Sequence, residues 1–261
     1  MFDLATLEVA LAGTIFTGKL HFSPVTDSTN TDALAAARIG APHGSVYFAD
    51  EQRAGRGRGD HAWQSAACEG LYVSVLLRLA IPASILSLIP LTAGLAAAEA
   101  IHAASGLTVD LRWPNDLLIG TRKAGGILVE SKTGGGGAAF AVVGIGINVH
   151  QRAFDPGLAT PATSLDLESG ARIGRQQLLL ALLKSLEHQT QGLDEPTAIT
   201  AIPERVAKAS TWVKNRRVEV HGPQACVGVS AGLDAQGFLL VRTDEGMVTV
   251  QTGGIRAAEM S

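Results

Sequence analysis

Cysteine is scarce in this chain of 261 residues, which contains only Cys68 and Cys226. The two residues lie far apart and neither belongs to a CxxC pair, so the clustered ligands of a structural zinc site are missing. Two reduced thiols in a protein of the cytoplasm are the simpler expectation.

An excess of basic charge is also missing. The sequence has 21 Lys and Arg against 24 Asp and Glu, which gives a net charge of -3 and a pI of about 6.2. This balance argues against binding of nucleic acid through the overall charge of the protein, although it does not exclude a local basic patch.

Long uncharged apolar runs are absent as well. No run of roughly 18 apolar residues avoids charge, so we expect no membrane span. The N-terminal stretch MFDLATLEVALAGTIF has no basic residue before its apolar part, and Asp3 and Glu8 interrupt it. We therefore expect no signal peptide and no membrane partner.

Hydrophobic periodicity and turn residues predict the elements of a large first part. Ser28 or Thr29 is expected to cap a first helix, and Gly106 to end the second. The expected helices cover 32–39, 84–105 and 176–191, and the expected strands cover 45–51, 70–79, 109–113, 125–131 and 140–149, with a loose hairpin loop at 133–137. Pro203 leaves the state of residues 196–208 open. Because these elements do not alternate as βαβ units, we predict an α+β fold with a mixed or antiparallel sheet flanked by helices.

The pattern changes after Trp212. Short alternating apolar runs follow, joined by turns that contain glycine, such as the one at 234–237. This pattern is typical of a small β-barrel or meander. We therefore predict two domains, residues 1–211 and residues 212–261.

The stretch AGRGRGDHAW at residues 54–63 places glycines and arginines in alternation. It matches neither the P-loop GxxxxGK[ST] nor the dinucleotide-binding GxGxxG. Ordering so many glycines costs conformational entropy, which a bound anion would offset. A flexible solvated turn and an anion-binding loop are both compatible with the stretch taken alone.

Two further stretches carry polar groups at strand ends. RWPNDLL at 112–118 displays Asn115 and Asp116 beside a proline that disfavours a strand interior. RKAGGILVE at 122–130 places Lys123 before two glycines that permit close approach of backbone to a ligand. Taken singly, the first is also compatible with an ordinary turn and the second with a hairpin that carries a solvated lysine.

Together and in this order, the motifs are more specific. STN at 28–30, QRAGRGR at 52–58, RWPND at 112–116, KAGGILVE at 123–130 and GIGINV at 144–149 resemble the biotin–protein ligase family over about residues 25–165. The resemblance implies a catalytic domain similar to class II aminoacyl-tRNA synthetases and an SH3-like module at the C-terminus. It also implies two reactions, formation of biotinyl-5′-AMP from biotin and ATP and transfer of biotin to a lysine of a carrier domain.

The resemblance also implies roles for individual residues. Biotin would be held by Ser28, Thr29, Asn30, Gln52, Arg56, Gly57, Arg58, Lys123 and Gly126, and ATP by Arg58, Trp63, Arg112, Asn115 and Asn148. Arg58 and Lys123 would act on the reacting carboxylate and the α-phosphate, because fixed cations stabilise charge that gathers there. Asp116 would bind Mg²⁺ through water. For Trp63, a place in the core is an equal alternative.

Some positions depart from the family pattern. Gly59, Asp60 and His61 stand where many members carry a further basic residue and a glycine, and Arg112 replaces a more frequent lysine. Asp60 brings a negative charge near the expected anion site, which leaves the pairing within the loop open.

Partners follow from the same resemblance. The expected acceptor is the biotin carboxyl carrier domain of acetyl-CoA carboxylase. A homodimer through a sheet edge is possible, and no DNA binding is expected because no helix-turn-helix pattern precedes STN. The alternatives are a lipoate or octanoate protein ligase, a non-catalytic biotin-binding sensor, and a nucleic-acid binder using Arg53, Arg56 and Arg58.

Overall fold

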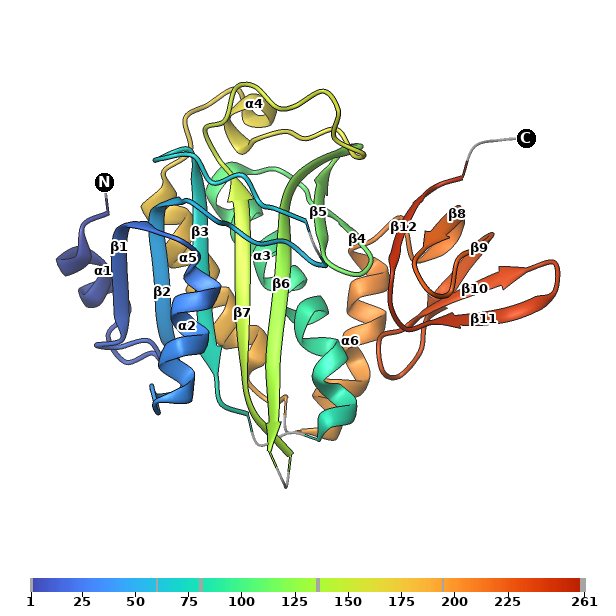
Figure 1. The fold of residues 1–261 in the computed structure, drawn as a ribbon, viewed down its shortest axis with the longest axis horizontal. Helices are drawn as coiled ribbons and strands as arrows, with labels where there is room; N and C mark the ends of the chain where they lie inside the picture. Colours follow the sequence, from blue (N-terminus) through green and yellow to red (C-terminus); the bar gives the residue numbers. More distant parts are fainter. Residues whose placement is uncertain (1, 60, 80–81, 135–136, 194, 259–261) are drawn as a thin grey trace.

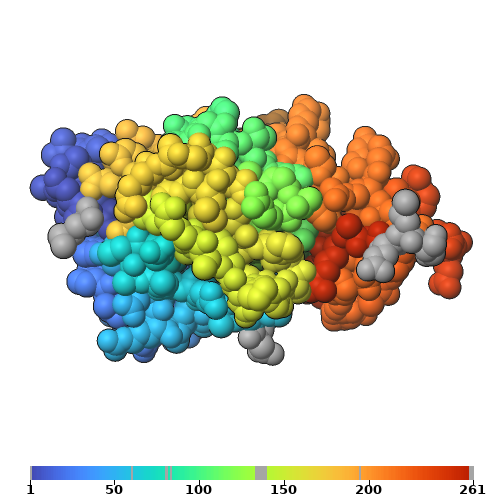
Figure 2. All heavy atoms as spheres, turned by 90° about the horizontal axis from the view of Figure 1, so that it is seen from above, coloured from blue at the N-terminus to red at the C-terminus, as the bar shows by residue number. Residues whose placement is uncertain are grey.

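A computed structural model describes residues 2–59, 61–79, 82–134, 137–193 and 195–258. Two β-sheets organise these residues, a seven-stranded sheet and a smaller five-stranded one (Figure 1). The N-terminal residues and the small sheet lie at opposite ends of the molecule (Figure 2).

The large sheet has the strand order β1-β2-β3-β7-β6-β5-β4. Its strands are β1 (Leu20–Thr26), β2 (Ser45–Gln52), β3 (Gly70–Leu77), β4 (Asp110–Arg112), β5 (Asp116–Ile119), β6 (Arg122–Gly134) and β7 (Gly137–Asn148). Strands β1 and β2 are parallel and the other neighbours are antiparallel, so the sheet is mixed. The expected α+β fold is confirmed.

Helices cover both faces of this sheet. Helix α2 (Thr29–Arg38) packs on β2, β3 and β7 in front, whereas α3 (Ile89–Ser105) and α5 (Arg175–Thr190) pack against each other and the sheet behind (Figure 1). The other helical elements are α1 (Leu4–Ala10), η1 (Ala83–Leu88), α4 (Leu165–Ser169) and α6 (Pro196–Lys208). Fully buried aliphatic side chains of α3, α5, β3 and β7 fill the main core.

The small sheet has the order β11-β10-β9-β8-β12. Its strands are β8 (Lys214–His221), β9 (Cys226–Leu233), β10 (Leu239–Thr243), β11 (Gly246–Val250) and β12 (Gly254–Ala257). Its Gly237 turn rests on the large part, since Trp113 Nε1 donates to the Gly237 carbonyl at 3.0 Å and Ser87 Oγ donates to the Gln236 carbonyl at 2.7 Å. The predicted meander of short strands is therefore present.

Several details differ from the expectations. The first helix begins at Thr29 rather than Asp32, and Ser28 occupies its N-cap without a side-chain capping bond. The first turns of the second expected helix are a 3₁₀ helix, η1, before α3. Residues 196–208 do form a helix, α6, with Pro203 inside it. The β6–β7 hairpin is longer than expected, because its strands extend to Gly134 and from Gly137.

One helical segment resembles a membrane span in its composition. Within the described residues, Ser84–Ser105 is long and apolar enough to cross a membrane by length and composition, with a mean hydropathy of 1.7. In the fold, 61% of its apolar window is buried. A core helix covered by the sheet and α5 has the same composition, because both settings exclude water.

Candidate active site

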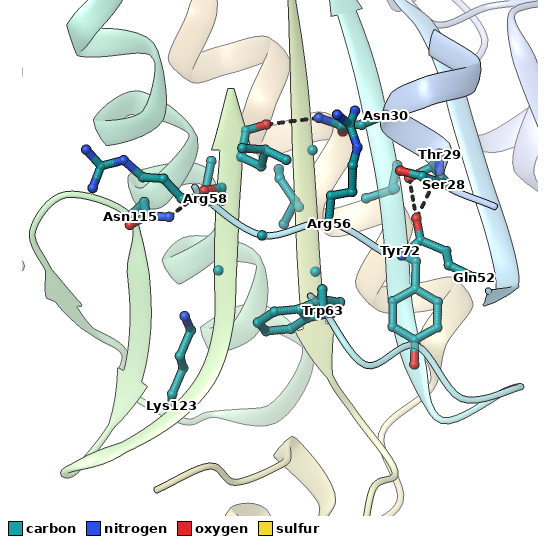
Figure 3. A pocket seen from close by; sticks show the side chains of 18 residues that line it. Ser28, Thr29, Asn30, Gln52, Arg56, Arg58, Trp63, Tyr72, Asn115 and Lys123 are labelled. Atoms are coloured by element: carbon teal, nitrogen blue, oxygen red, sulfur yellow. Dashed lines mark hydrogen bonds between the residues drawn. The ribbon is translucent and has the colours of Figure 1, made fainter. Parts of the chain in front are cut away.

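An open pocket with an empty volume of about 470 Å³ lies on the front of the large sheet, under the glycine–arginine loop of residues 53–64. It brings together most of the residues predicted for the site, and Figure 3 shows how they face one another. These residues are Ser28, Thr29, Asn30, Gln52, Arg56, Gly57, Arg58, Trp63, Asn115, Lys123 and Gly126.

One end of the pocket is built from buried neutral groups at the start of α2. Ser28, Thr29 and Asn30 are only 3–4% exposed. The Thr29 backbone N–H and hydroxyl both donate to Gln52 Oε1, at 2.9 and 3.1 Å (Figure 3). Because Ser28 makes no capping bond, its hydroxyl is available to a ligand. This end offers amide and hydroxyl groups fixed by a helix start and a strand end.

Glycines form the floor of the pocket. Gly126 of β6 and Gly146 of β7 are paired across the ladder, and the Trp63 indole lies over them. A Cβ atom on Gly146 would come 2.6 Å from Trp63 Nε1, and one on Gly126 would come 3.5 Å from the Trp63 ring. Trp63 Nε1 is itself buried without a hydrogen-bond partner among the described residues. The absence of side chains at both glycines therefore makes room for the flat indole of Trp63.

The glycine–arginine loop folds back on itself. The Gly57 N–H donates to the His61 carbonyl at 2.7 Å, and the Trp63 N–H donates to the Gly55 carbonyl at 2.8 Å. A Cβ atom on Gly55 would come 2.4 Å from the Trp63 carbonyl, so this close turn requires glycine. The Gly57 N–H is therefore already used as a donor within the loop in this conformation. Asp60 lies outside the described residues.

The two arginines of the loop diverge (Figure 3). Arg56 forms a bidentate pair with Glu130, with distances of 3.1 Å from Nη1 to Oε1 and 2.6 Å from Nη2 to Oε2. Arg58 instead donates to the Gly253 carbonyl and to Thr252 Oγ1, the latter at 2.9 Å, in the turn between β11 and β12. Burial lowers the pKa of Arg58, while the charge of Asp116 opposes that change. The loop is thus held at one side by the large sheet and at the other by the small sheet.

Asp116 lies between two cations. Lys123 Nζ is 2.5 Å from Asp116 Oδ1, and Arg112 Nη2 is 2.6 Å from Asp116 Oδ2. Burial alone would raise the pKa of Asp116, but Lys123 and then Arg112 outweigh it and hold the pKa below its usual value. The ion pair with Asp116 fixes the position of the Lys123 ammonium group beside the pocket.

The residues do not fit a protein-held magnesium ion. Both oxygens of Asp116 already accept from a cation. Within the described part of the chain, no group of three or more His, Cys, Asp or Glu side chains is placed to hold a metal. A carboxylate neutralised by two cations is a poor ligand for a hard divalent ion. The expectation for Asp116 thus finds no support in this arrangement.

Two predicted nucleotide-binding residues lie apart from the main pocket. Arg112 lines a smaller adjacent hollow, together with Asn115 and Asp116. Asn148 lines neither space, and its Nδ2 donates to the Thr163 carbonyl at 3.0 Å.

The sequence reasoning missed other lining residues. Tyr72 of β3 and the glycines at 144 and 146 belong to the pocket, and the fully buried Ser74 bonds to the lining residues Thr29 and Asn30. The glycines at alternate positions in GIGIN were the available signal, because residues at i and i+2 of a strand share one face. Glu130 was quoted within KAGGILVE but was given no role.

Two protein-family models match the chain, one over the large sheet and one over the small sheet. Residues 22–148 match the model of the biotin/lipoate A/B protein ligase family, and residues 215–255 match the model of the biotin protein ligase C-terminal domain. The second match corresponds to the small sheet, an SH3-like module in this family.

Individual relatives are similar over most of the chain. The bifunctional ligase/repressor BirA of Bacillus spizizenii is 34% identical over 243 residues, covering 90% of this chain and 73% of that protein. The biotin–[acetyl-CoA-carboxylase] ligase of Mycobacterium tuberculosis is 34% identical over 238 residues, covering 88% and 85%. The solved structure of the Aquifex aeolicus biotin protein ligase in complex with biotin and ATP superimposes with a TM-score of 0.78 at 27% identity, covering 92% and 98%.

Proposed function

The chain belongs to the biotin/lipoate A/B protein ligase family, and from that membership and the pocket we propose that it is an ATP-dependent biotin–protein ligase. The observation that carries the proposal is a single pocket with two unlike ends. Neutral hydrogen-bonding groups of Ser28, Thr29 and Gln52 lie at one end and Arg58 and Lys123 lie at the other, with Arg56 between them (Figure 3).

The neutral end suits the ureido ring of biotin. That ring has a carbonyl acceptor and N–H donors, which match hydroxyl and amide groups. The dithiolane ring of lipoate and the chain of octanoate would leave buried polar groups of Thr29 and Gln52 without ligand partners. Hydrogen-bonding groups at this end thus favour biotin over the lipoate or octanoate alternative.

The charged end suits the reaction. In the first step a biotin carboxylate oxygen attacks the α-phosphorus of ATP, and the bond from that phosphorus to pyrophosphate breaks. In the second step an acceptor lysine amine attacks the carbonyl carbon, AMP leaves, and the amine proton passes to solvent. Neither step needs a protein nucleophile, and both need fixed positive charge where oxyanions gather.

We assign the positive charge to three side chains. Arg56 is placed to orient the biotin carboxylate, and Lys123, held by Asp116, to stabilise charge at the carboxylate and the α-phosphate. Arg58 reaches the adenylate phosphate after exchanging its partners in the small sheet. We assign Trp63 and Asn115 to contacts with the nucleotide. Magnesium enters as part of Mg-ATP on the phosphates, and we assign it no protein ligand.

The remaining assignments are of the same kind. Residues 1–211 would form the catalytic domain and residues 212–261 a small domain that closes against the loop. We propose a cytoplasmic setting, and as acceptor the biotin carboxyl carrier domain of acetyl-CoA carboxylase, after the names of the relatives. The net charge of -3 supports action without DNA binding. Salt-sensitive binding of duplex DNA near physiological ionic strength would contradict that last assignment.

The direct test incubates the purified protein with biotin and Mg-ATP, with and without an acceptor carrier domain. Pyrophosphate release, biotinyl-AMP in the pocket by mass spectrometry and one biotin added to the carrier are the expected results. Biotin binding without pyrophosphate release would point to a sensor. Preference for lipoate in competition would select the other branch of the family.

A further inference from the structure

The Glu130 carboxylate accepts three side-chain hydrogen bonds although it is partly open to solvent. It lies on β6, outside the residues that line the pocket, with a side chain that is 29% exposed. Its carboxylate accepts both Arg56 Nη groups from the glycine–arginine loop and Asn30 Nδ2 from α2, the latter at 2.9 Å. One carboxylate thus joins the loop, the first helix of the pocket and the sheet.

The orientation of Glu130 is fixed from inside the fold. Asn30 Oδ1 accepts from Ser74 Oγ at 2.5 Å, and Ser74 Oγ lies 2.8 Å from Thr29 Oγ1. A Cβ atom on Gly144 would come 2.0 Å from Asn30 Oδ1, so the strand leaves room for this amide only because glycine stands there. A continuous hydrogen-bonded chain therefore runs from the neutral end of the pocket, through Ser74 and Asn30, to Glu130.

The Arg56–Glu130 pair has little to do with overall stability. The Arg56 side chain is 41% exposed, and ion pairs this open to solvent contribute little to folding because water screens them. A bidentate pair does, however, fix the plane of a guanidinium. Its effect is therefore expected in the position of the loop.

We propose that Glu130 is the positioning residue of the glycine–arginine loop, holding Arg56 at the pocket mouth where it meets the biotin carboxylate. The bidentate pair engages one N–H of each Nη group, which leaves the remaining N–H groups of Arg56 for a ligand. This role rests on the proposed function for the identity of the ligand, but not for the position of the loop.

The test uses Glu130→Gln in the full-length protein, with Glu130→Asp as the conservative variant. The matched control is Glu204→Gln, which removes a carboxylate from the Lys208 pair on α6, where the side chains are 73% and 74% exposed. Limited trypsin digestion reports the loop directly, because trypsin cuts after Arg56 and Arg58 when the loop is open. The KM for biotin in adenylate formation is measured in parallel.

Glu130→Gln should be cut in the loop about tenfold faster than the wild type and should have a KM for biotin raised about tenfold, a factor equivalent to 1.4 kcal/mol. Its Tm should match that of Glu204→Gln, and Glu130→Asp should recover part of the loss. Loop cleavage and KM equal to those of Glu204→Gln would overturn the proposal. A lowered Tm without preferential loop cleavage would also overturn it, by assigning Glu130 a structural role.

Failure of the proposed function gives a different result. If the wild type forms no adenylate, the ligase assignment fails, while the cleavage rates of ligand-free Glu130→Gln and wild type still decide whether Glu130 positions the loop. If the wild type forms adenylate and the variants behave alike, only the positioning role fails.

Discussion

At the neutral end of the pocket, Ser28, Thr29 and Asn30 are almost fully buried, whereas at the charged end the side chains of Arg56 and Lys123 are 41% and 28% exposed. The neutral groups bond to one another through a network that the helix and sheet determine. Each charged group is instead neutralised by another charged or polar protein group. The two ends therefore prepare for a ligand in different ways.

This difference separates recognition of the ligand, at the neutral end, from closure of the loop over it, at the charged end. The neutral end is preorganised, so a matching ring gains hydrogen bonds with little ordering of the protein. At the charged end each cation is already bonded to a protein group. An anionic ligand must therefore share the cation with that group or replace it. Variants at the first end should lose binding together with stability, whereas loss of Arg58 at the second end should change the rate at which the intermediate leaves.

The largest effect on stability is expected for Asp116→Ala. The change leaves the buried Arg112 guanidinium and Lys123 without their shared counter-ion, and breaking such a pair costs about 3–5 kcal/mol. Urea unfolding should show this loss, and the exposed turn variant Asp244→Ala should show almost none. Equal midpoints for the two variants would contradict the role of Asp116 as a structural counter-ion.

The same carboxylate predicts a pH dependence with a definite sign. The pKa of Asp116 is held below its usual value of 3.8, so the folded state favours the ionised form. Its contribution is complete above that value and is lost as the pH falls through the folded pKa. The difference in unfolding free energy between wild type and Asp116→Ala should be flat near neutral pH and shrink below about pH 4. A difference that grows on acidification would contradict the pKa direction.

Arg58→Gly should release biotinyl-AMP faster. Loss of charged hydrogen bonds from a half-buried arginine is expected to cost about 2–3 kcal/mol of adenylate retention, roughly a 30- to 150-fold increase in the dissociation rate. Stopped-flow chase with unlabelled biotin and ATP measures that rate. Arg53→Gly, at an exposed position of the same loop, is the matched control. An unchanged rate in Arg58→Gly would remove Arg58 from the site.

Thr29→Val addresses the neutral end. The change keeps the side-chain shape but removes the hydroxyl that bonds to Gln52 and Ser74. Each partner keeps one other hydrogen bond, so the expected cost is that of lost hydrogen bonds, about 0.5–1.5 kcal/mol. Both the unfolding free energy and the affinity for biotin should fall. Thr200→Val on exposed α6 removes only a bond to the Thr197 carbonyl and should change neither by much. Loss of affinity without loss of stability would show that this end is not preorganised.

The smallest effect, and the sharpest in sign, is expected for Thr252→Ala. If Arg58 must leave the small sheet to reach the adenylate, removing one of its partners there should favour the bound state by about 0.5–1 kcal/mol. Isothermal titration with a non-hydrolysable adenylate analogue should show slightly tighter binding. Weaker binding would mean that Arg58 keeps its contact with the small sheet when the ligand is bound.

Much of the fold was predictable because it depends on local patterns. The long apolar periodicity of α3 and α5 and the alternating strands of the small sheet were visible in the sequence. Helix α1, strand β1 and strand β5 were missed, because they have little periodicity of their own. Their positions follow from neighbours, as for β1, which pairs along the parallel edge of β2.

The candidate site was predictable as a set of residues but not as a set of contacts. The motifs contain most of the residues that line the pocket, and their glycines indicated that backbone would lie close to other groups there. The motifs could not give the partners of the charged groups, because these come from distant parts of the chain. Arg56 meets Glu130, and Arg58 meets Thr252 and Gly253, only after the two sheets have packed.

The sequence by itself determined which chemical groups the site contains. Residue types fix which groups are charged, which can form hydrogen bonds and where the backbone can turn. The tertiary structure alone decided which of these groups are paired. It placed Asp116 between two cations rather than in a metal site, and it bonded Asn148 to the Thr163 carbonyl, outside the residues that line the pocket. The physical reason is that electrostatic and hydrogen-bond partners are chosen by distance in space, and folding sets those distances between residues far apart in the chain.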